Sequence, residues 1–147
     1  MSRIGVTGTI ELITRDISTG KILDWYRGPN LVVSAGLDAI ADRVRGNTAV
    51  GGASSYALGT DSTLPVSGQT ALIAEAYRNT LTQTFVSAGE LRMTLVLGAT
   101  QGNGITFTEG GAFNEQNTMF CRVVFPPKAK TNLQELTIIH SIVFAAS

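Results

Sequence analysis

The stretch Asn30-Leu-Val-Val-Ser-Ala-Gly-Leu-Asp-Ala-Ile-Ala-Asp-Arg-Val-Arg-Gly46 predicts the end of a strand followed by one helix. Ser34 stands where an N-cap is expected, with its hydroxyl free to accept an N–H group of the first helical turn. Apolar residues then recur at helical spacing and predict one buried stripe, made of Leu37, Ile40, Ala41 and Val44. Gly46 can end the helix. We therefore expect one short helix over about residues 34–45.

Alternation of apolar and polar residues, the period of a half-buried strand, predicts most of the remaining elements. It gives an N-terminal hairpin around a turn at 16–20, broken at Gly28-Pro29. Further strands are expected at 77–86, 91–97, 105–108, 119–125 (closed by Pro126-Pro127) and 136–144. About seven to nine short strands with frequent turns are typical of a β-sandwich or jelly roll. We expect a mainly β fold with one short helix, in a single domain over residues 1–147.

The composition favours a protein that assembles with others. Only 15% of the residues are charged and 44% are hydrophobic, whereas about 25% charged residues is typical of soluble domains. A surface poor in charge favours contact with other proteins, and the alternative is a monomer whose surface is mostly Ser, Thr, Asn and Gly. The contact surfaces expected from composition and length are the N-terminal segment and the loops 46–70 and 98–118.

Charge and hydropathy argue against two classes of partner. The net charge is zero, with 11 basic and 11 acidic residues, so no basic field attracts nucleic acid or an anionic membrane. No apolar run approaches the ~18 residues of a membrane span. The first residues lack the pattern of a signal peptide, so we expect the protein to be made in a cytoplasm.

Residues suited to catalysis or to metal binding are scarce. His140 is the only histidine and Cys121 the only cysteine, and both lie in apolar strand patterns that predict buried structural residues. A structural zinc site needs four ligands, so we expect no metal and no cofactor. Asp61 with Ser62 and Thr63 is more typical of a loop that caps its own backbone than of a calcium site. We expect a protein that is not an enzyme.

Three segments, in order, resemble a family of small virion proteins of tailed bacteriophages. Residues 30–41 are similar to its opening N-L-V-V-x-x-G-L-x-x-I-A. Residues 56–61 and 70–78 resemble its I-A-L-G-x-G-x-x-x-P-x-x-x-D-T-x-L-x-x-E-x-x-R. Residues 120–144 resemble its close, F-A-R-x-x-F-P-P-x-x-K-T-x-x-x-x-L-x-I-x-W-x-I-x-F.

This chain departs from the family at two motifs. The family's E-A-G-L-F is Glu109-Gly-Gly-Ala-Phe113 here, and the tryptophan near its end is His140. The resemblance implies a β-sandwich in a virion, where copies of the chain contact one another and other virion proteins. A place in the tail, at the fibre base or baseplate, is favoured over a capsid decoration (cement) protein of the head. A carbohydrate-binding module, served by Trp25 and the three tyrosines, is the third hypothesis.

Five residues are candidates for the interface. Aromatic and arginine side chains often anchor interfaces, which singles out Trp25, Tyr26 and Arg27, although a tryptophan is as often found in a core. Arg78 is spaced to pair with Glu75. Arg78 and Arg122 are each expected to reach Glu109 or a neighbouring subunit, with solvated edge charges as the alternative.

Overall fold

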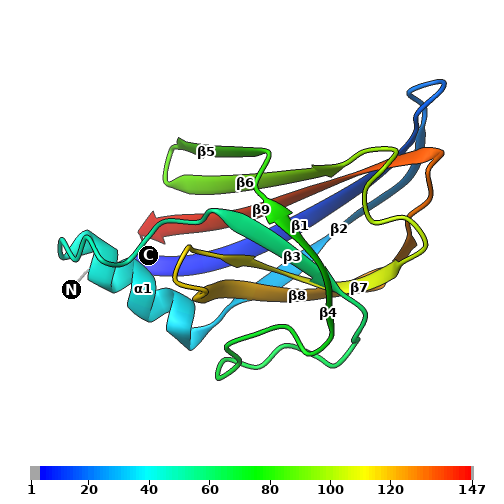
Figure 1. Ribbon diagram of the computed structural model, residues 1–147. Coiled ribbons are helices and arrows are strands. Elements are labelled where there is room, and N and C mark those ends of the chain that lie inside the picture. The colour runs from blue at the N-terminus through cyan, green and yellow to red at the C-terminus, as the bar shows by residue number, and fades with distance from the viewer. Residues whose placement is uncertain (1–3, 147) are drawn as a thin grey trace.

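Nine antiparallel strands and one helix make up residues 4–146, the part of the chain that the computed structural model describes (Figure 1). The helix is α1 (Ser34–Val44), and the strands are β1 (Ile4–Asp16), β2 (Ile22–Val32), β3 (Ser55–Gly59), β4 (Glu75–Thr80), β5 (Gln83–Ser87), β6 (Glu90–Leu97), β7 (Thr106–Phe113), β8 (Met119–Ala129) and β9 (Gln134–Ala146). The predicted mainly β fold with one short helix is confirmed.

The strands follow the order β4-β3-β7-β8-β2-β1-β9-β6-β5 in one folded-over sheet. Strand β2 belongs to both layers, because it pairs with β1 up to Asn30 and then with β8 through Leu31 and Val32. The two ends of this strand order also meet, between β4 and β5. The Leu81 N–H donates to the Ser54 carbonyl beside β3, and the N–H of the next residue, Thr82, donates to the Thr94 carbonyl of β6. The chain thus changes layer there too, and the sheet is nearly closed.

The main core lies between the two layers. Strands β1, β6 and β9 supply one set of buried side chains, including Ile10, Leu12, Met93, Leu95, Leu97, Leu136, Ile138 and Ile142. Strands β3, β7 and β8 supply the other, including Tyr56, Leu58, Phe107, Ala112, Cys121, Val123 and Phe125. The alternation predicted for residues 136–144 is confirmed, since its inward-facing residues are buried from Leu136 to Ile142.

A second, smaller core lies on the outer face of β3, β7 and β8. It contains Val33, Ala57, Leu72, Phe113 and Met119. Leu72 comes from residues 60–74, the segment between β3 and β4, which we name the strap. The strap therefore covers apolar side chains that this face of the sheet would otherwise expose.

The start of α1 differs from the prediction. Its N-cap is Val33, which makes no side-chain cap hydrogen bond, and Ser34 is already the first helical residue. The Ser34 backbone N–H donates to the carbonyl of Ser67 in the strap at 2.9 Å. The Ser34 side chain is therefore not the cap. Gly46, with a φ of 97°, follows the helix as predicted.

The predicted apolar stripe of α1 is correct only at Ile40, which packs against the main core, and is wrong at its other three positions. Gly36 and Ala39 are the buried residues of the helix, while Leu37 is 42% and Val44 is 83% exposed. The reason is the close approach of α1 to β8: a Cβ at position 36 would lie 2.2 Å from the Phe120 carbonyl oxygen. Glycine permits this contact, and it rotates the helix away from the expected face.

Two proline breaks predicted from the sequence lie inside strands. Strand β2 continues through Gly28-Pro29, which still lie opposite Ile10 and Thr9 of β1, shortly before β2 begins to pair with β8 at Leu31. Strand β8 continues through Pro126-Pro127, opposite a register shift where β7 passes from pairing at Phe107 to pairing at Glu109. A bulge or a change of partner removes the need for the N–H group that proline lacks.

Two other expectations need correction. The single strand expected at 77–86 is divided into β4 and β5, because the chain changes layer at residues 81–82. The expected contact loops 46–70 and 98–118 contain the whole of β3 and of β7, whose residues are largely buried. Only parts of these segments are therefore surface loops.

Candidate functional site

The three candidate contact residues of β2 lie at different depths. Trp25 is 57% exposed and lies opposite Ile13 in the β1–β2 ladder. Arg27 is exposed opposite Glu11. Tyr26 is half-buried against the main core, with the Lys128 ammonium 5.7 Å from its ring centroid. Trp25 and Arg27 are thus available to a partner, whereas Tyr26 packs against the core of its own domain.

Arg78 forms the local ion pair expected with Glu75. Its Nη2 and Nε donate to the two Glu75 carboxylate oxygens at 2.7 and 3.0 Å. Nη1 donates to Asn117 at 2.7 Å, and the guanidinium lies 3.9 Å from the centroid of the Phe113 ring. Arg78 is partly exposed on the edge strand β4, but its donors are already engaged.

Arg122 makes the first of the two contacts considered for it, with Glu109. Both side chains are fully buried, and Arg122 Nη2 and Nε donate to Glu109 Oε2 at 2.8 and 3.0 Å. Arg122 Nη1 donates to the Thr63 carbonyl at 2.7 Å. No surface of Arg122 is left for another subunit.

The buried ion pair also holds the strap. Glu109 accepts hydrogen bonds from the backbone N–H groups of Ala74 at 2.7 Å and Ile73 at 3.1 Å. Asp61 caps the Thr63 N–H at 2.7 Å, as predicted for a self-capping loop. Hydrogen bonds from Thr63, and in smaller part the charge of Arg122, lower the pKa of Asp61. The carboxylates of Glu109 and Asp61 therefore hold the backbone of the strap in place.

His140 and Cys121 lie together with Tyr56 in the middle of the main core. The Tyr56 hydroxyl is 2.6 Å from His140 Nδ1, and Cys121 Sγ is 4.0 Å from the same nitrogen. Burial lowers the pKa of His140 to about 3 and raises the pKa of Cys121 to about 12. Both side chains are thus neutral at pH 7, which agrees with the buried structural role predicted for them.

Lys130 is a buried charge that the sequence analysis did not single out. Its ammonium donates to the Gly98 carbonyl at 2.7 Å, the Thr131 carbonyl at 2.7 Å and Asn103 Oδ1 at 2.9 Å. Burial lowers the pKa of Lys130. The three acceptors connect the β6–β7 loop to the end of β8. The sequence signal for it was the lysine of the family's F-P-P-x-x-K-T motif, which Lys130 matches.

Five exposed apolar side chains come from the end of the β1–β2 hairpin and from the β8–β9 loop, which is hydrogen-bonded to it. We name this set the tip cluster, and it consists of Ile17, Ile22, Leu23, Trp25 and Leu133. Leu133, from the β8–β9 loop, is 70% exposed, and its carbonyl accepts the Ile17 N–H at 3.0 Å. The tip is the hairpin that projects beyond the rest of the sheet at the upper right of Figure 1. Trp25 is the one candidate interface residue that belongs to it.

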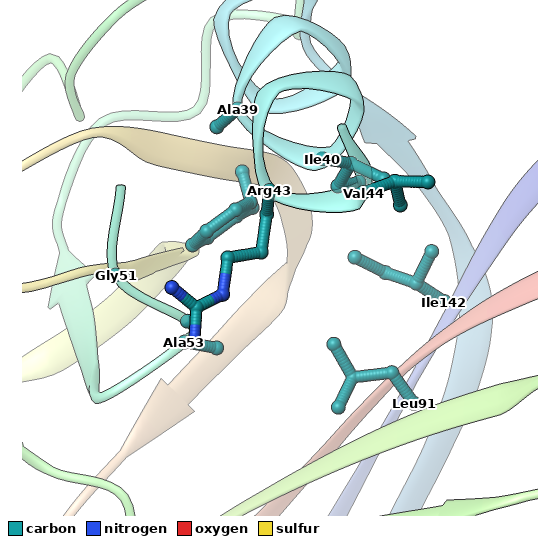
Figure 2. A pocket seen from close by; sticks show the side chains of 10 residues that line it. Ala39, Ile40, Arg43, Val44, Gly51, Ala53, Leu91 and Ile142 are labelled. Atoms are coloured by element: carbon teal, nitrogen blue, oxygen red, sulfur yellow. The ribbon is translucent and has the colours of Figure 1, made fainter. Parts of the chain in front are cut away.

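A small apolar pocket opens beside α1, which we name the α1 pocket (Figure 2). It has a volume of about 150 Å³ and is lined by Ala39, Ile40, Arg43, Val44, Gly51, Gly52, Ala53, Leu91, Phe120 and Ile142. Arg43 is its one charged residue, and Nη1 of Arg43 donates to the Val50 carbonyl at 3.3 Å. The pocket is suited to an apolar group beside a hydrogen-bond acceptor.

The aromatic residues considered for carbohydrate binding are dispersed. Tyr56 is fully buried, Tyr26 and Tyr77 are half-buried against the main core, and only Trp25 is well exposed. Within residues 4–146, no three His, Cys, Asp or Glu side chains are grouped to hold a metal ion. The helix found in the same range is too short to cross a bilayer. No family model, curated protein or solved structure matches the chain.

Proposed function

We propose that this chain is a non-enzymatic structural protein of a tailed-phage virion, assembled in the host cytoplasm through contacts with copies of itself and with other virion proteins. The observation that carries the proposal is the exposure of large apolar side chains at both ends of the sheet. The tip cluster lies at one end, and Leu37, Val44 and the α1 pocket lie at the other. Exposed apolar patches of this kind mark protein contacts.

The residues that carry the resemblance to the virion family support the same proposal. Glu109, Arg122 and Lys130 are all buried, and each bonds to backbone groups of a long loop. Buried charges with complete hydrogen bonding hold loops in one arrangement at a cost in desolvation. A fixed surface is what repeated docking in a symmetric particle requires.

The burial and protonation of His140 and Cys121, the two side chains best suited to catalysis, favour a structural role over a catalytic one. His140 and Cys121 are fully buried in the main core. Burial keeps the imidazole neutral and the thiol protonated, because it lowers the pKa of His140 and raises that of Cys121. A cysteine that acts as a nucleophile has to be a thiolate that substrate can reach, whereas Cys121 is a buried thiol.

The tail position is favoured by the resemblance alone, with a decoration protein of the head as the alternative. A phage with a stop codon in this gene separates the two. Loss of tails, or of infectivity in otherwise filled heads, supports the tail position. Complete particles whose heads release DNA on heating support the decoration role instead. Particles with normal tails, infectivity and heat resistance contradict both roles.

A further inference from the structure

We infer that copies of this chain join head to tail, with the tip cluster of one copy seated in the α1 pocket of the next. The inference extends the proposed function by naming the surface through which copies meet, but it does not require a virion. It rests on two unpartnered apolar features, one projecting and one concave.

The two features lie too far apart to meet within one molecule. Residue Gly8 of β1 is paired with Ile142, which lines the α1 pocket, while Asp16 ends β1 at the turn that carries the tip cluster. Eight residues of strand at about 3.3 Å each place them roughly 25 Å apart. Figure 1 shows α1 and the tip hairpin at opposite ends of the sheet. A contact between the tip cluster and the α1 pocket therefore requires two copies.

The chemistry of the pocket fits the side chains of the tip. Its lining is aliphatic and aromatic except for Arg43, and its volume is about 150 Å³. An apolar cavity of about this size accommodates a benzene-sized group, so one isoleucine or leucine side chain is a suitable occupant. Leu133 is the most exposed member of the tip cluster, at 70%. We assign it as the inserting side chain.

The charges at the two ends are compatible with this contact. Asp16 is on the tip, and hydrogen bonds from Ser18 and Thr19 lower the pKa of its carboxyl, which is therefore ionised at pH 7. Lys21 on the same turn makes the tip neutral overall, so it does not repel the guanidinium of Arg43. Figure 2 shows that guanidinium beside Ala53 at the pocket, where it can donate to Asp16 of a second copy.

A contact between two different surfaces of the same chain is heterologous. Such contacts repeat from copy to copy and produce either a closed ring or an open row, depending on the rotation between neighbours. Each copy then uses one tip and one pocket. This property allows a direct test with variants that lack only one of them.

Sedimentation equilibrium measures the contact. The wild type is expected above the monomer mass, with association that strengthens as concentration rises. Leu133→Asp places a charge on the tip, and Ala53→Phe fills the pocket; each is expected to weaken association at least about tenfold, because a buried unpaired charge or a blocked site removes the contact. Leu64→Asp, at a residue that is 76% exposed on the strap, is the matched control and keeps the wild-type mass.

Mixing the two variants distinguishes this contact from a symmetric one. The Ala53→Phe copy retains an intact tip and the Leu133→Asp copy an intact pocket, so an equimolar mixture is expected to form a 1:1 dimer and nothing larger. A mixture that remains monomeric overturns the inference. So does a wild type that is monomeric at every concentration, or a variant that keeps the wild-type mass. If Ala53→Phe does not fold, Val44→Asp at the pocket rim replaces it.

The virion proposal is judged separately. A wild type that is monomeric in solution overturns the head-to-tail contact, yet the chain can still be found in purified particles by counting its copies. Conversely, the chain can associate head to tail in solution and yet be absent from purified particles. That result would support the contact and contradict the virion role.

Discussion

The Tyr56 hydroxyl and His140 Nδ1, 2.6 Å apart, form a hydrogen bond that connects the two layers of the sheet through the middle of the main core. Tyr56 belongs to β3 and His140 to β9, which lie in opposite layers. The other ring nitrogen, Nε2, is buried and has no hydrogen-bond partner among the described residues. Only one of the two ring nitrogens of His140 is therefore hydrogen-bonded within the described part of the chain, and the contribution of this bond to the free energy of unfolding can be measured directly.

A double-mutant cycle on this pair is expected to show strong coupling. Tyr56→Phe and His140→Phe each leave the other side chain with an unpaired buried group, at a cost of about 1–3 kcal/mol in the free energy of unfolding. The double variant removes both polar groups, so its loss is smaller than the sum of the single losses. Urea unfolding of the four proteins measures this, and simple additivity would contradict the coupling.

Stability is expected to depend on pH through His140. The pKa is about 3 in the folded protein and about 6.5 in the unfolded chain. Because the unfolded state binds the proton more readily, the free energy of unfolding is unaffected above pH 6.5 and falls as the pH drops from 6.5 towards 3. The loss at pH 5 is about 2 kcal/mol. Unfolding between pH 7 and pH 5 measures it, and His140→Phe is expected to remove this dependence.

Breaking the buried ion pair is expected to free the strap. Glu109→Gln leaves the buried Arg122 charge with only Asp61, 3.8 Å away, as an acidic partner, so we expect a cost near the lower end of the about 3–5 kcal/mol for a broken buried pair. Limited proteolysis is then expected to cut first within residues 60–74, whose Ile73 and Ala74 N–H groups lose an ionised acceptor. Glu75→Gln, in the exposed pair with Arg78, is the control and costs under ~1 kcal/mol. Equal losses for the two variants would contradict this role of Glu109.

The contact between α1 and β8 depends on Gly36. Gly36→Ala puts a methyl group 2.2 Å from the Phe120 carbonyl oxygen, so α1 must shift, at a cost of about 1–3 kcal/mol. Gly52→Ala is the control, because nothing lies within 4 Å of a Cβ built there. Thermal unfolding of both variants tests the contact. A Gly36→Ala protein as stable as the wild type would show that α1 does not pack this closely.

The elements predicted correctly are those whose signal is local. The alternation of residues 136–144 is confirmed by the burial of β9. The turn expected at 16–20 joins β1 to β2, with Gly20 at a positive φ of 72°. Both features depend on neighbours in sequence, so a single chain suffices to find them.

The features that the sequence did not reveal depend on strand order. Prolines 29, 126 and 127 fit inside strands only because of where those strands change partner or register. Glu109 and Arg122 meet because β7 and β8 are neighbours, and the strap that covers them comes from a third part of the chain. The face that α1 buries follows from a contact with Phe120, 84 residues after Gly36. None of these partners is visible in local periodicity.

The number of copies of this chain in purified particles tests the central claim most directly. Quantitative mass spectrometry of separated heads and tails, calibrated against the major capsid protein, supplies that number. The account predicts a fixed count of a few to a few dozen copies in the tail fraction, and hundreds in the head fraction would assign the decoration role instead. Absence of the chain from both fractions would contradict a virion protein altogether.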